Sequence, residues 1–236
     1  MAPDIPGKMY LADQRGLLET PFLRRYSTFS FGDYAHPDKQ AFGRLYGLNE
    51  ETLAGAHTLE LAVAQASHVL LLPITGALAV DTGTGAGPAA TVEVEQVRLL
   101  TVPAGAVLRL TNPYDTELVS FLHLWLLADE PGTAATPPVF SFDLQATDNQ
   151  LRVVVPFGAS QGQAFSLSLG RFAGRGETVY AVQRPGAQLF AFVLAGAFEL
   201  EGRLLHAQDG LALWDAQVVE LEALSNNALV LVLELG

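Results

Sequence analysis

The chain has 236 residues, of which 50% are hydrophobic and 16% charged, and its formal net charge is −12. This composition predicts a folded protein of one or two domains with a sizeable core, and it excludes a disordered chain. The acidic charge disfavours nucleic acid as a partner, and the absence of cysteine excludes disulfides, thiolate metal sites and a cysteine nucleophile.

Residues 1–16 contain no basic segment followed by an apolar one, so we expect no signal peptide. The longest apolar runs, such as residues 69–74, are far shorter than the roughly 20 residues that a membrane-spanning helix needs. The sequence therefore predicts a cytoplasmic protein that does not enter a membrane.

The first half of the chain shows short segments with the two-residue period of strands. Residues 26–34 alternate small and aromatic side chains, which predicts a strand with one aromatic face. Residues 49–51, Asn-Glu-Glu, have the composition of a helix start, but the pattern is too short to predict a helix. Strand-like segments then extend from residue 58 to residue 80 and are broken at Pro73 and Gly76.

The glycine-rich residues 82–88 resemble a phosphate-binding loop in composition only. Strand-like residues 91–97 follow them, whereas a phosphate site would need the N-terminus of a helix there. We therefore predict a flexible hairpin tip. Two further strands are expected within residues 99–112 and 118–127.

Residues 128–138, rich in Pro, Gly and Thr, are the best candidate for a linker. We place a domain boundary inside them, with an N-terminal domain of residues 1–135 and a C-terminal domain of residues 136–236. The second half has short strand segments at the spacing typical of sandwiches and barrels. These segments are residues 151–156, 164–169, 177–182, 188–194, 197–200, 210–214, 218–221 and 228–235. The sequence therefore predicts an all-β protein of two similar antiparallel β-barrels.

A weak internal repeat supports two domains of one type. In residues 71–78 and again in residues 190–198, an apolar strand runs into a glycine and a new strand begins. The two glycines are Gly76 and Gly196.

Three stretches carry a resemblance to a known family: residues 27–34, the Gly76 turn followed by residues 102–105, and residues 209–215. The chain resembles the bicupins of the pirin-like family, which includes bacterial quercetin dioxygenases. The resemblance covers roughly residues 9–235. It implies two cupin barrels of the jelly-roll, or double-stranded β-helix, type, with the residues before Ser27 contributing a strand near the C-terminal barrel.

Members of this family hold one divalent metal in the N-terminal barrel, through two histidines two residues apart, a glutamate and a later histidine. The resemblance places these positions at Ala62, Ala64, His68 and Leu110, or at Leu108 in place of Leu110. The corresponding positions of the second half are Val182, Arg184 and Gln188. Neither half therefore keeps the ligand set that the family uses.

A single imidazole does not hold a divalent metal, because such sites need three or four ligands. The resemblance therefore implies either a protein without a cofactor or one divalent metal (Fe, Ni, Cu or Mn) in an altered site. An altered site would need some of the residues His57, Glu60, His68 and His123.

Three histidines, His57, His68 and His123, are candidates to line a ligand pocket. His68 is expected on one inner face with Ala62, Ala64, Ala66, Leu70 and Leu72. There it is either a core histidine bonded to a neighbour or a group that contacts a ligand. His123 has the same two interpretations and shares its parity with Phe121 and Trp125.

Two functions from different classes follow. The favoured one is a pirin-like bicupin that has lost its metal ligands and acts as a non-catalytic small-molecule-binding or interaction protein, with a small apolar or planar molecule as its partner. The alternative is a quercetin 2,3-dioxygenase-like oxidoreductase with an altered metal site. The resemblance to pirins also implies a third role, as a regulatory partner of the transcription machinery.

Overall fold

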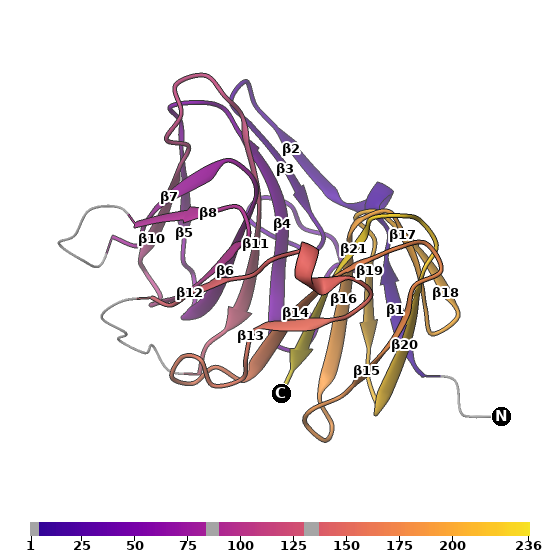
Figure 1. The fold of residues 1–236 in the computed structure, drawn as a ribbon. Coiled ribbons are helices and arrows are strands. Elements are labelled where there is room, and N and C mark those ends of the chain that lie inside the picture. Colours follow the sequence, from indigo (N-terminus) through magenta and orange to yellow (C-terminus); the bar gives the residue numbers. More distant parts are fainter. Residues whose placement is uncertain (1–4, 84–89, 130–136) are drawn as a thin grey trace. The chain divides into compact units, whose positions relative to one another are not determined.

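The computed structural model of the protein describes residues 5–83, 90–129 and 137–236 (Figure 1). Within them the chain forms β-strands and two short 3₁₀ turns, η1 (Ala12–Gln14) and η2 (Gln145–Thr147). The prediction of an all-β protein is therefore confirmed. None of the described segments is a helix long and apolar enough to cross a membrane.

The chain divides into two compact units. The N-terminal unit comprises Gly16–Phe142 and Gly158–Gln163, and the C-terminal unit comprises Met1–Arg15, Asp143–Phe157 and Ala164–Gly236. The predicted boundary after residue 135 lies outside the described residues, as does most of the predicted hairpin tip at residues 82–88.

The N-terminal unit is built from two antiparallel sheets. The larger sheet has the strand order β12 (Val139–Ser141), β9 (Gln96–Val102), β6 (Ser67–Thr75), β11 (Val119–Leu127), β4 (Leu45–Leu53), β3 (Leu23–Ser27) and β2 (Gly16–Glu19). The smaller sheet has the order β5 (Thr58–Ala62), β10 (Val107–Thr111), β7 (Ala77–Asp81) and β8 (Ala90–Glu93).

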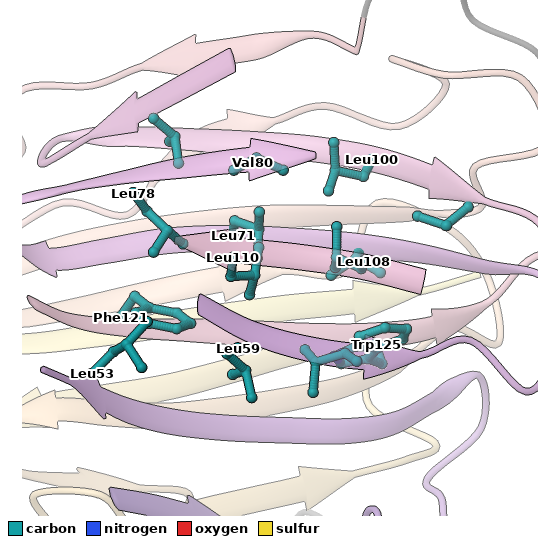
Figure 2. Close-up of a cluster of buried hydrophobic side chains, with 14 of the residues drawn as sticks. Leu53, Leu59, Leu71, Leu78, Val80, Leu100, Leu108, Leu110, Phe121 and Trp125 are labelled. Carbon is teal, nitrogen blue, oxygen red and sulfur yellow. The ribbon is translucent and has the colours of Figure 1, made fainter. Parts of the chain in front are cut away.

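Apolar side chains from both sheets form one core between them, which we call the interior of the N-terminal unit. Alternate residues of a strand point to opposite faces, so each strand contributes every second residue. The smaller sheet contributes, among others, Leu59, Leu61, Leu78, Leu108 and Leu110. The larger sheet contributes, among others, Val69, Leu71, Leu100, Phe121 and Trp125 (Figure 2).

The C-terminal unit repeats this two-sheet plan. One sheet has the order β1 (Gly7–Tyr10), β19 (Gly210–Leu213), β16 (Gln188–Ala195), β21 (Ala228–Leu235), β14 (Phe165–Phe172) and β13 (Arg152–Val155). The other has the order β15 (Glu177–Ala181), β20 (Val218–Ala223), β17 (Ala197–Leu200) and β18 (Arg203–His206). Each strand segment predicted for the second half overlaps one of these strands, whereas β18 had no predicted segment.

The N-terminal residues are shared between the units. Strand β1 pairs with β19 of the C-terminal unit, as the resemblance implied, whereas β2 and β3 pair in series with β4 of the N-terminal unit. The predicted strand over residues 26–34 is wrong, because β3 ends at Ser27. Phe31 and Tyr34 then close a tight turn through two backbone hydrogen bonds, and Gly32 takes a φ of 57° that a strand residue does not adopt.

The glycine turns that suggested a repeat are confirmed. Gly76 separates β6 from β7, and Gly196 separates β16 from β17. Their φ angles are 71° and 76°, in the left-handed region that glycine adopts without steric cost. The same turn therefore joins corresponding strands in the two units.

Candidate functional site

The inner face predicted for residues 62–72 is wrong. Leu61 and Val63 belong to the core, while Ala62 and Ala64 are exposed. The reason is that residues 63–66 form a bend between β5 and β6, and a bend does not carry side-chain parity from one strand to the next.

His68 is fully buried, but on the face of the larger sheet that points away from the interior. Its partner across the β6–β11 ladder is Leu126, while the core residues of β6 are its neighbours Val69 and Leu71. His68 Nδ1 lies 3.0 Å from Thr101 Oγ1. Burial lowers the pKa of this imidazole below its ordinary value.

His57 lies apart from both other histidines. It is an exposed residue before β5, its Nδ1 is 2.7 Å from the carbonyl oxygen of Gly55, and its ring stacks on Phe22 at 4.9 Å between centroids. His68 and His123 occupy opposite faces of one sheet. The structure therefore does not bring the three candidate pocket histidines together.

His123 is on the inner face of β11, between the core residues Phe121 and Trp125, and its parity was predicted correctly. Its ring is held at both nitrogens. The indole Nε1–H of Trp125 donates to His123 Nδ1 at 2.5 Å, and His123 Nε2 lies 2.8 Å from Glu51 Oε1. Since Nδ1 accepts a hydrogen bond, Nε2 carries the proton and donates it to the carboxylate.

Glu51, on the inner face of β4, also binds an arginine. Arg25 Nε donates to the same Oε1 atom that His123 contacts. Glu51 is completely buried and Arg25 nearly so, with 7% of its surface exposed. Burial lowers the pKa of His123, which favours the uncharged imidazole. The positive charge that balances the carboxylate of Glu51 is therefore the guanidinium of Arg25.

Asn49 extends this group, and we call Arg25, Asn49, Glu51 and His123 the inner polar cluster. Strand pairing places Asn49 beside His123, and two residues from Glu51 on the same face. Both polar atoms of the Asn49 amide, Glu51 Oε2 and Arg25 Nη2 have no hydrogen-bond partner among the described residues. Buried polar atoms in this condition are uncommon, and they are usually satisfied by an ordered water or another bound group.

Phe31 lies against one end of the inner polar cluster. Its ring centroid is 5.6 Å from the rings of both His123 and Trp125, and 5.4 Å from the guanidinium carbon of Arg25. Gly47 makes this position possible, because a Cβ added there would meet Phe31 Cδ2 at 3.0 Å. Phe31 is itself partly exposed.

Sequence reasoning found His123 but missed Arg25, Asn49 and Glu51. The available signal was alternation over residues 45–53, where Gly, Asn and Glu occupy every second position between two leucines. That pattern places polar residues on a face that ends at the core residue Leu53, which is unusual for a strand packed on one side. Because residues 49–51 have the composition of a helix start, this alternation was not interpreted as a strand.

The C-terminal unit also has a buried carboxylate, but its partners are complete. Glu234 accepts hydrogen bonds from Tyr180 Oη at 2.7 Å and from the backbone N–H groups of Gln183 and Arg184 at 3.0 and 2.8 Å. Burial together with this carboxylate raises the pKa of Tyr180 to about 12. Glu234 therefore anchors a loop.

The interior of the N-terminal unit has apolar side chains where a metal site would need ligands. The smaller sheet presents Leu61, Leu108 and Leu110 to the interior, and their side chains have no donor atoms. The described parts of the chain contain no group of three or more His, Asp or Glu residues that could hold a metal ion. Of the family positions, Ala62 and Ala64 are outside the interior, His68 faces away from it and Leu110 is in its core.

The two buried histidines predict a pH dependence of stability. A base whose pKa is lowered by folding binds fewer protons in the folded chain than in the unfolded one. The free energy of unfolding should therefore fall as the pH drops from about 6.5 through the lowered pKa values of His68 and His123.

Denaturant midpoints at neutral pH and near pH 5 check this expectation. The double variant His68→Gln/His123→Gln should lose less stability over that range than the wild type, whatever its absolute stability. His57→Gln is the matched control, since that histidine is exposed. Equal losses in the wild type and the double variant would contradict the prediction.

Comparison with known proteins shows similarity to cupin proteins in both sequence and fold. Residues 161–235 match the family model of the quercetinase C-terminal cupin domain. A quercetin 2,3-dioxygenase of Escherichia coli is 22% identical over 225 residues, covering 93% of this chain and 95% of that protein.

Solved structures agree over almost the whole chain. YhhW from Escherichia coli superposes with a TM-score of 0.82 at 20% identity, covering 98% of each chain. The bacterial pirin YhhW in complex with nickel(II) gives a TM-score of 0.77 at 21% identity, covering 98% of this chain and 99% of that one. These findings confirm the cupin jelly-roll plan of both units. The chain is therefore similar, over nearly its whole length, to the pirin-like, quercetinase-like bicupins.

Proposed function

We propose that this chain is a cytoplasmic pirin-like bicupin that has lost the metal ligands and acts by binding a small molecule without catalysis. The observation that supports it most is the composition of the interior of the N-terminal unit. Leucine occupies the inner positions of β5 and β10, and the one inner histidine is bonded at both ring nitrogens.

The chemistry of a divalent metal explains why these residues do not fit one. Iron, nickel, copper and manganese in proteins need three or more nitrogen, oxygen or sulfur ligands around one point. Leu108 and Leu110 offer none, and His123 Nδ1 would have to give up the hydrogen bond from Trp125 before it could bind a metal. Glu51 is engaged by Arg25, whose positive charge opposes a nearby cation.

The small-molecule part of the proposal depends on the inner polar cluster. Its unpartnered atoms belong to residues that are buried inside the unit and lie beside a partly exposed aromatic side chain. A surface that interacts with another protein would not require such atoms in the interior. The observations therefore favour a small ligand over a protein partner.

Metal analysis tests the proposal. Protein purified without chelators should contain far less than one ion of iron, nickel, copper or manganese per chain, and calorimetric titration with nickel(II) should show no stoichiometric site. Escherichia coli YhhW, solved with nickel(II), is the positive control for the same procedure. Stoichiometric binding of any of these metals by the full chain would contradict the proposal.

The alternative is a quercetin 2,3-dioxygenase-like oxidoreductase that holds one divalent metal in an altered site. Its support is that a relative named for this activity aligns over almost the whole chain. Oxygen uptake with quercetin, measured with and without added iron, nickel, copper or manganese and beside YhhW, separates the two. Turnover above the buffer rate that requires a metal would favour the oxidoreductase.

A further inference from the structure

The unpartnered atoms of the inner polar cluster define the hydrogen-bonding chemistry of whatever fills it. Arg25 Nη2 and the amide nitrogen of Asn49 are donors, while Glu51 Oε2 and the amide oxygen of Asn49 are acceptors. A partner that satisfies these atoms must therefore offer both a donor and an acceptor. A carboxamide does so, since its C=O accepts and its NH₂ donates, and it can form two opposed hydrogen bonds with the Asn49 amide.

The charges of the inner polar cluster favour an uncharged ligand. The positive charge of Arg25 and the negative charge of Glu51 are already paired inside the interior, and His123 is uncharged. An anion placed beside Glu51, or a cation placed beside Arg25, would bring an uncompensated charge into an apolar interior. A carboxylate or an ammonium group therefore fits the cluster worse than an amide of the same shape.

The surroundings of Phe31 indicate what the carboxamide is attached to. Gly47, Asn49 and Glu51 follow one another on the inner face of β4, about 7 Å apart at each step. The ring of Phe31 lies on Gly47, beside the ring of Trp125. An aromatic ring in that place can carry a carboxamide that reaches Asn49.

We propose that the inner polar cluster is the binding site for a planar aromatic carboxamide, and that Phe31 occupies the place of the ligand's ring until the ligand displaces it. The proposal rests on the small-molecule role given above and names the ligand class for it. In the bound state the ligand's ring packs against Trp125 and Gly47. Its amide pairs with Asn49, accepts from Arg25 and donates to Glu51.

Benzamide is the probe, with benzoate and benzene as matched controls that lack the donor and the amide, respectively. Binding is followed by calorimetry and by the fluorescence of Trp125 in a Trp214→Phe background, which leaves Trp125 as the sole indole. Benzamide should bind the full chain and benzoate should not. Phe31→Ala should bind benzamide about tenfold more tightly or better, because the closed state no longer competes.

Two further variants separate binding from folding. Asn49→Leu removes a buried amide without partners, so the variant should be at least as stable as the wild type and yet lose benzamide binding. Phe22→Ala changes an exposed phenylalanine outside the cluster and should leave binding unchanged. A purely structural role for Asn49 would not produce retained stability together with lost binding.

The outcomes distinguish this proposal from the one before it. If benzamide binds neither the wild type nor Phe31→Ala better than benzoate and benzene do, the cluster holds ordered water and the carboxamide site is wrong. That result would leave the metal-free interior intact. A stoichiometric metal found by elemental analysis would instead overturn the proposed function, whatever benzamide does.

Discussion

Replacing Glu51 by leucine is expected to lower the free energy of unfolding by about 3–5 kcal/mol. The carboxylate is completely buried and is the partner of both the Arg25 guanidinium and the His123 Nε2–H. Its loss leaves a positive charge and a ring donor in an apolar interior with nothing to compensate them. Denaturant unfolding of the full chain measures the change.

Two comparisons show whether the cost comes from the orphaned partners. The triple variant Arg25→Met/Glu51→Leu/His123→Leu should be within about 1 kcal/mol of the wild type or more stable, because an apolar cluster of similar volume replaces the whole network. The exposed pair Glu19–Arg24, which links β2 to β3 with Arg24 on the opposite face of β3 from Arg25, is the second control, and Glu19→Leu should have little effect. If the triple variant is as unstable as Glu51→Leu, the network itself is needed for folding.

The strands could be predicted because their signals are local. Alternating side chains and glycine turns located most of the strands, and the turns at Gly76 and Gly196 identified the repeat. Where a turn contains aromatic residues, as at Phe31 and Tyr34, the same alternation was mistaken for a strand. The pairing of β1 with β19 came only from the family resemblance, since no local pattern specifies a partner so distant in the chain.

The candidate site was only partly predictable because it depends on pairing between strands. His123 was assigned the correct face, since its parity was compared with Phe121 and Trp125 on one uninterrupted strand. The face of His68 was wrong, since the comparison with Ala62 crossed a bend. The pairing of β3, β4 and β11 brings Arg25, Asn49 and Glu51 close to His123. The spacing of residues in the sequence does not predict which strands pair.

Leu110→Ala is expected to destabilise the chain by about 2–5 kcal/mol, which is the usual cost of a cavity in a packed core. Leu110 is completely buried and belongs to the cluster that also contains Leu71 and Phe121 (Figure 2). Since its neighbours come from both sheets, they cannot all move to fill the space that the side chain leaves.

The size of this effect tests where a ligand can lie. If the interior around Leu110 were an open pocket, truncation would remove little packing and cost much less than in a filled core. Leu118→Ala, at a side chain with 62% of its surface exposed, gives the reference for a leucine without such packing. A loss at Leu110 no larger than the loss at Leu118 would place the ligand space among the leucines. A much larger loss of stability for Leu110→Ala would show that the leucines are tightly packed. The inner polar cluster would then be the part of the interior where a ligand can form hydrogen bonds.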